Sequence, residues 1–89
     1  MKYQVSDGVR IQPISIPGRF FVFSVDPHAI LQIDAKSALV IKIAASAQDA
    51  EEAVSLYASA TKSELSDARI SFERISQQLI DSGILTKSL

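Results

Sequence analysis

The chain of 89 residues contains no cysteine, so disulfide bonds, thiolate catalysis and cysteine metal sites are excluded. Its absence is typical of a cytoplasmic protein. His28 is the only histidine, so any Ser–His–Asp arrangement would have to use it. A lone histidine in a turn segment is ordinarily a solvated turn residue, and without cysteine it does not form a common transition-metal site. We therefore predict no catalytic residue, no metal and no cofactor, and a protein that is not an enzyme.

Glycine is scarce, and charge of one sign is missing. Gly8, Gly18 and Gly83 stand far apart, so no glycine-rich phosphate-binding loop exists. Nine basic residues nearly balance ten acidic ones, the net charge is −1, and the charges are scattered. Nucleic-acid binders usually carry a basic face, because phosphate neutralisation supplies most of their affinity. We therefore predict that nucleic acid is not a partner.

Long hydrophobic runs are also absent. The longest, ALVIKIAA, is broken by Lys42, whereas a membrane-spanning helix needs about 20 apolar residues. The first ten residues, MKYQVSDGVR, lack the apolar segment of a signal peptide. We predict a single domain covering 1–89, a cytoplasmic location and no membrane partner.

The first half of the chain has the patterns of β-strands. Apolar and polar residues alternate along 9–16, and Pro13 interrupts the alternation. Because proline cannot donate to a ladder, we expect an edge strand with a bulge near Pro13. Pro17 and Gly18 then fit the two central positions of a type II turn, where proline presets φ and glycine tolerates positive φ.

Two more strands follow. Aromatic and β-branched residues dominate 19–26, which predicts the second strand. Asp26 and Pro27 predict the next turn, since the Asp side chain can bond to the backbone ahead and proline suits the following position. Residues 29–34 form the third expected strand. Three strands with two short connections predict an antiparallel meander.

The second half has helical patterns. Asp34 is the expected N-cap of a first, largely buried helix. The segment 46–49, which ends in Asp49, predicts a second helix start, and the pattern leaves open whether the two helices are separate or form one bent rod. A third helix is expected to run to about Ser82. Gly83 then fits the residue after its C-cap, with two aliphatic residues packing beyond it. The fold class is therefore α+β.

The third helix carries a narrow apolar face that we expect in the core. It comprises Leu65, Ala68, Phe72, Ile75 and Leu79. Ile70 and Ile80 lie to one side of it, among Arg69, Glu73, Ser76 and Gln77. Two interpretations remain open: these isoleucines widen the core face or sit singly on the surface, or this flank lines a groove.

Two segments, FVFSVDPHAILQIDAKSALVI and FERISQQLIDSGIL, resemble the PqqD-like proteins, the recognition elements of ribosomally synthesised and modified peptides. The shared pattern is a hydrophobic strand, a proline turn, a second strand, a helix, and a closing helix followed by Gly and two aliphatic residues. Ser76 departs from it, since leucine is common at that position. The resemblance implies a winged helix–turn–helix fold with three antiparallel strands and three helices.

The resemblance also implies a function. A member of this family acts as a non-catalytic chaperone that adds the leader segment of a precursor peptide to the edge of its third strand. It presents that leader to a separate modifying enzyme, such as a radical-SAM protein, a cyclase or a protease. An unpaired strand edge offers N–H and C=O groups that an extended peptide satisfies, while pockets read its alternate side chains.

Carried onto this chain, the resemblance implies a peptide-binding site with two parts. The strand edge comprises Ala29, Ile30, Leu31, Gln32 and Ile33. The helix wall comprises Arg69, Glu73, Ser76 and Ile80. Ser76 would leave a small polar gap for a leader side chain, and Arg69 would pair with an acidic leader residue.

Two further interpretations accompany this one: a winged-helix DNA-binding protein, and a subunit that only packs against a larger protein. A winged-helix DNA-binding protein shares the expected architecture, but in the last helix Asp67, Glu73 and Asp81 outnumber the two arginines. A strand edge can also pair with the edge of a second copy, which would give a homodimer that hides the binding edge. Phe20 or Phe21, on the outer face of the second strand, is a candidate contact for the modifying enzyme; the alternative is that these residues serve core and dimer packing.

Overall fold

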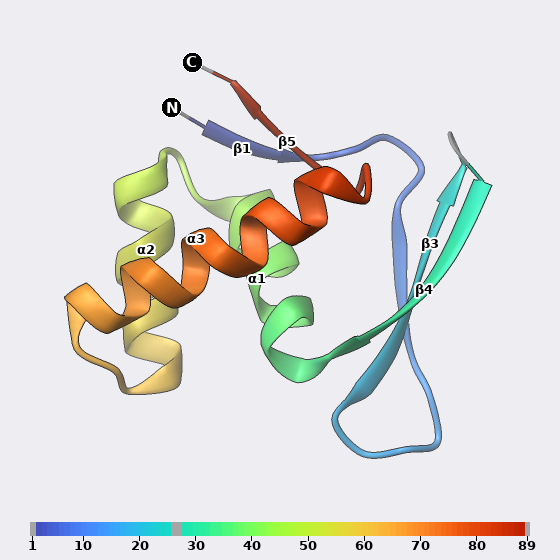
Figure 1. Ribbon diagram of the computed structural model, residues 1–89, viewed down its shortest axis with the longest axis horizontal. Helices are drawn as coiled ribbons and strands as arrows, with labels where there is room; N and C mark the ends of the chain where they lie inside the picture. The colour runs from blue at the N-terminus through green and yellow to red at the C-terminus, as the bar shows by residue number, and fades with distance from the viewer. Residues whose placement is uncertain (1, 26–27, 89) are drawn as a thin grey trace.

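The computed structural model describes residues 2–25 and 28–88, and it shows an α+β fold with three helices and two antiparallel sheets. Figure 1 shows the sheet of β2, β3 and β4 to one side of the helices, with the two chain ends close together. The elements follow in the order β1 (Lys2–Val5), β2 (Arg10–Pro13), β3 (Arg19–Val25), β4 (His28–Asp34), α1 (Ala35–Ser46), α2 (Ala50–Thr61), α3 (Leu65–Asp81) and β5 (Leu85–Ser88).

The larger sheet is the antiparallel meander that the sequence predicts, in the order β2-β3-β4. Val22 pairs with Ile11 on one side and with Leu31 on the other, and its side chain is buried. The turn before β3 is also confirmed: the Arg19 N–H donates to the Ile16 carbonyl at 3.2 Å, and Gly18 has a φ of 74°. The predicted turn at Asp26 and Pro27 lies outside the described residues.

The predicted bulge at Pro13 is wrong. The register of β2 against β3 runs unbroken from Arg10 opposite Phe23 to Pro13 opposite Phe20, and β2 ends there. Because proline lacks an N–H group, the strand stops at this residue without accommodating it as an inserted residue.

The two acidic caps define two separate helices. The Asp34 carboxylate accepts a 2.9 Å hydrogen bond from the Ser37 N–H at the start of α1. The Asp49 carboxylate accepts one of 2.8 Å from the Glu52 N–H at the start of α2. α1 ends at Ser46 and α2 begins at Ala50, so the two helices are separate and do not form one bent rod.

The end of α3 follows the prediction closely. Gly83 has a φ of 79°, and its N–H donates to the Ile80 carbonyl at 3.0 Å. The Ile84 N–H donates to the Leu79 carbonyl at 2.9 Å, which completes a Schellman motif. Ile84 and Leu85 are buried immediately afterwards, as expected.

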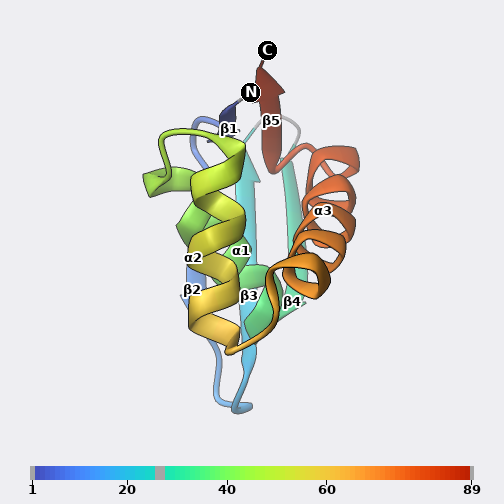
Figure 2. The same ribbon diagram turned by 90° about the vertical axis from the view of Figure 1, so that its left-hand side faces the viewer.

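α1 is the central helix of the core. Figure 2 shows it between the sheet and α2, and its buried residues Val40 and Ile41 join the apolar cluster of all three helices. Four of the five residues predicted for the α3 core face are buried. Leu65 is the exception, with 51% of its surface exposed. It is the first residue of α3.

A second, two-stranded sheet was not predicted. β1 pairs antiparallel with β5, with Tyr3 opposite Lys87. The Tyr3 ring lies edge-on to Phe72 with centroids 5.4 Å apart, and the Lys87 ammonium lies 5.3 Å from the Tyr3 ring centre. This sheet therefore joins the two ends of the chain, and Tyr3 packs it against Phe72 of α3.

None of the helices in the described part of the chain is long and apolar enough to cross a membrane.

Candidate functional site

The free edge of β4 is the first part of the candidate site. β4 pairs with β3 along its whole length, from Val25 opposite His28 to Arg19 opposite Asp34. No strand in residues 2–25 or 28–88 pairs with its other edge. The five residues predicted for the strand edge therefore lie on a strand that is paired on one side and has a free edge on the other. They are Ala29, Ile30, Leu31, Gln32 and Ile33.

The two edges of this sheet differ in how they are protected. β2 carries a charged Arg10 and ends in Pro13, and both residue types disfavour the addition of another strand. Between residues 29 and 33, β4 contains no charged residue and no proline, and its register against β3 is unbroken. Of the two edges, that of β4 is the one open to another strand.

A pocket of about 320 Å³ lies against this edge. Its β4 wall includes Leu31 and Ile33, which also pack on the core, and its α3 wall includes Leu79. The complete lining is Arg19, Leu31, Gln32, Ile33, Asp34, Ser37, Gln78, Leu79 and Ser82. The pocket therefore combines an apolar floor with a polar rim, a composition suited to a side chain of an extended peptide.

The two charged residues of this pocket, Asp34 and Arg19, interact with groups of the protein itself. The hydrogen bond that the Ser37 N–H donates to the Asp34 carboxylate lowers the pKa of this carboxyl below its ordinary value, and the positive charge of Arg19 contributes in the same direction. Arg19 and Asp34 also face each other across β3 and β4. Asp34 is thus an anion at neutral pH whose first role is to cap the helix.

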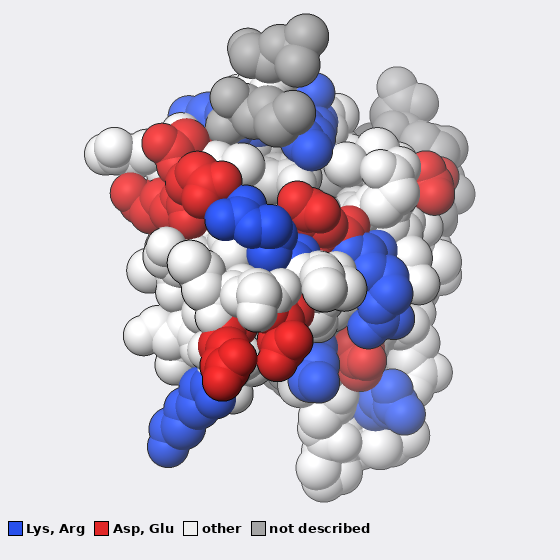
Figure 3. Space-filling view, turned by 60° about the vertical axis from the view of Figure 1, so that its left-hand side comes forward, with Lys and Arg blue, Asp and Glu red and all other residues white. Residues whose placement is uncertain are grey.

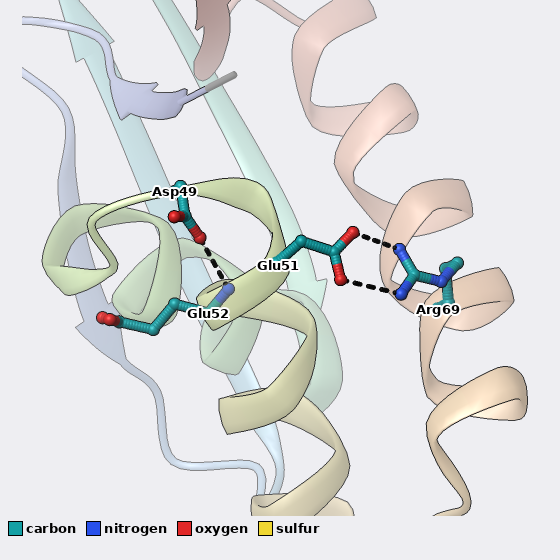
Figure 4. Close-up of polar contacts among 4 residues, drawn as sticks. All are labelled: Asp49, Glu51, Glu52 and Arg69. Carbon is teal, nitrogen blue, oxygen red and sulfur yellow. Dashed lines mark hydrogen bonds and ion pairs between the residues drawn. The ribbon is translucent and has the colours of Figure 1, made fainter.

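The predicted helix wall lies elsewhere. Arg69 donates two hydrogen bonds of 2.9 Å to the Glu51 carboxylate of α2, as Figure 4 shows, so it faces α2. This ion pair lowers the pKa of Glu51 and raises that of Arg69. Arg69 is therefore engaged within the protein and does not belong to the pocket lining.

The other three wall residues do not line the pocket either. Ser76 is buried, and its hydroxyl has no hydrogen-bond partner. Ile80 is half-buried against the core, and Glu73 is exposed. Residues two apart on a helix differ by about 200° in direction, so Gln78 and Ser82 lie on the side of α3 opposite to Ser76 and Ile80. The structure thus brings the predicted edge together with a different flank of α3.

Six of the nine lining residues were not among the predicted site residues: Arg19, Asp34, Ser37, Gln78, Leu79 and Ser82. The isoleucines drew attention to one flank of α3, whereas the polar flank containing Gln78 and Ser82 faces β4. A signal was present only for Ser37, because the Asp34 cap places the first turn of α1 at the end of β4. Only the docking of α3 decides which flank is turned to the strand.

No other region of the described chain suggests chemistry. No group of three or more His, Cys, Asp or Glu residues in residues 2–25 and 28–88 could hold a metal ion. A second pocket of about 360 Å³ lies between β1 and α1, with Lys2, Tyr3 and Ala44 in its lining, and no residue of β4 lines it. Charges of both signs lie side by side on the face in Figure 3, and no continuous basic area forms on that face.

Comparison of the chain with protein-family models, with curated proteins and with solved structures gives no match.

Proposed function

We propose that this protein is a PqqD-like peptide chaperone with a winged helix–turn–helix architecture. It binds the leader segment of a ribosomally synthesised precursor peptide as an added strand on β4 and presents it to a separate modifying enzyme. The chain itself takes no part in catalysis. Three antiparallel strands that lead into three helices support the architecture.

One observation carries the proposal: the unprotected edge of β4 borders a pocket that also includes α3. Main-chain hydrogen bonds to the edge supply affinity without sequence preference. The pocket over Leu31, Ile33 and Leu79 supplies selectivity, because one apolar peptide side chain fills it while the neighbouring ones point to solvent.

The binding test is a backbone amide NMR titration of the labelled protein. The titrants are synthetic leader segments from short open reading frames beside its gene. We expect shifts in residues 28–34 and around Gln78 and Ser82. Shifts confined to the face of α2 and Arg69 would contradict the proposed site, and the absence of shifts with every peptide would contradict the function.

The peptide itself offers the matched control. In a strand pair, only every second N–H group of the added strand points to its neighbour. N-methylation of alternate residues in one set should abolish binding, and methylation of the other set should leave it nearly unchanged. Equal effects of both sets would show that the peptide does not bind as a strand.

The second candidate, a winged-helix DNA-binding protein, has less support. Its recognition helix would be α3, whose exposed surface carries Asp67, Glu73 and Asp81, while Arg69 is paired with Glu51. DNA binding at low salt that disappears as salt rises would favour this candidate.

A further inference from the structure

The outer face of the sheet carries an apolar strip that reaches the free edge. Val22 is buried towards the helices, so its neighbours Phe21 and Phe23 face the opposite side. Their rings pack edge-on with centroids 6.1 Å apart. Phe23 lies opposite Ile30 of β4, which is 65% exposed. We call Phe21, Phe23 and Ile30 the outer strip.

The outer strip ends at Ile30 because β4 is the last strand of the sheet and no further strand pairs with its free edge in residues 2–25 or 28–88. In an antiparallel pair, residues opposite each other point to the same face. Two β4 strands related by a twofold axis perpendicular to the sheet therefore place one residue opposite its own copy. With Ile30 on the axis, the row Phe23–Ile30 continues without interruption into Ile30 and Phe23 of a second copy.

Charge also favours this occupant. An isologous contact brings each residue near its own copy, so a charged residue close to the axis would repel itself. The stretch of β4 that is symmetric about Ile30, residues 28–32, contains no Asp, Glu, Lys or Arg. Arg10, the charged residue in the same row as Phe23 and Ile30, lies two strands away from the edge.

We propose that, without peptide, β4 pairs antiparallel with β4 of a second copy about an axis at Ile30, and that this dimer closes the peptide-binding edge. The regulatory part rests on the proposed function. The peptide and the second copy need the same backbone N–H and C=O groups, so they exclude each other. Peptide binding then converts a dimer into monomers that each hold one peptide.

The first experiment measures mass by sedimentation equilibrium across micromolar to millimolar protein, with no peptide present. The wild-type mass should rise from that of a monomer towards that of a dimer. Ile30→Lys and Ile30→Glu should each stay monomeric, because like charges would meet at the axis. An equimolar mixture of the two should again form a dimer. Ile70→Lys, at a 69% exposed site on α3, is the matched control and should dimerise like the wild type.

Three results would overturn the inference. If the wild-type protein is monomeric at every concentration, the proposed dimer does not form. A dimer that persists in Ile30→Lys places the contact away from the edge of β4. If the mixture of the Lys and Glu variants stays monomeric, Ile30 does not lie on the twofold axis.

A crosslink tests the register independently. The chain has no cysteine, so Ile30→Cys introduces a unique thiol. Under mild oxidation we expect nearly complete conversion of this variant to a covalent dimer, and almost none for Ile70→Cys. Equal crosslinking of the two variants would indicate random collision and contradict the proposal.

The two proposals can fail separately. The mass measurements contain no peptide, so a monomeric wild type leaves the peptide-binding function standing. At protein concentrations low enough for the wild type to be monomeric, the edge of β4 is free, so a leader peptide should bind the wild type there. If no peptide binds the monomeric wild type, the proposed function fails while the dimer stands.

Discussion

Arg69, in the second turn of α3, donates two parallel hydrogen bonds of 2.9 Å to Glu51 in the first turn of α2. The pair is exposed to solvent, and Figure 4 shows it beside the cap that Asp49 forms at the start of α2. A residue that sequence reasoning placed in a peptide groove thus connects two helices on the other side of α3.

This ion pair should contribute to stability in a pH-dependent way. The pKa of Glu51 is lowered in the folded protein, so the contribution is present above the ordinary carboxyl pKa and is lost as the pH falls through the lowered one. We expect Glu51→Gln to lower the thermal midpoint slightly at neutral pH and low salt, and not at all near pH ~2. Melting curves across this range test it. A difference that persists in acid would show that the pair is not its cause.

The buried hydroxyl of Ser76 should be a source of instability. Its Oγ atom has no partner, and an unsatisfied buried polar group costs about 1–3 kcal/mol. We expect Ser76→Ala to raise the free energy of unfolding by about 1–2 kcal/mol in urea denaturation. Ser55→Ala, at an exposed position of α2, is the control that isolates helix propensity. Equal gains in the two variants would mean that burial of the hydroxyl costs nothing.

Lys62 ends α2 in a left-handed conformation, with a φ of 54°. A residue with a Cβ atom is strained there, whereas glycine is not. Lys62→Gly should therefore stabilise the protein by about 0.5–1 kcal/mol, despite the greater freedom that glycine gives the unfolded chain. Lys62→Ala keeps the strain and should change stability little. If both variants destabilise the protein equally, the lysine side chain itself is stabilising.

Two adjacent glutamines test the pocket. Gln78 lines it, whereas Gln77 does not and donates a 2.9 Å hydrogen bond to Asp81. We expect Gln78→Arg to weaken leader-peptide binding about tenfold, or by about 1.4 kcal/mol, because the longer side chain occupies the pocket. Gln77→Arg should leave the affinity unchanged. Isothermal titration with one peptide compares them, and an equal loss in both would move the binding surface away from β4.

Local signals in the sequence predicted much of the fold. Asp34 and Asp49 cap their helices, and Gly18 and Gly83 adopt the positive φ values that their turns require. Each of these outcomes depends on a few neighbouring residues, so a single sequence reveals them. The unprotected strand edge is also visible, since only the order of the strands is needed to place it.

The tertiary structure decided what no local pattern contains. β1 and β5 lie at opposite ends of the sequence, yet they pair with each other. Neither of these four-residue segments has a pattern strong enough to predict a strand by itself. The partners of Arg69 and Gln78 depend on the rotation of α3 about its axis. That rotation is set when Phe72, Ile75 and Leu79 settle on α1 and Tyr57, because burial of this face gains more free energy than any contact of a flanking polar residue. The sequence determined that an open strand edge exists, and the packing of the core decided which side of α3 stands beside it.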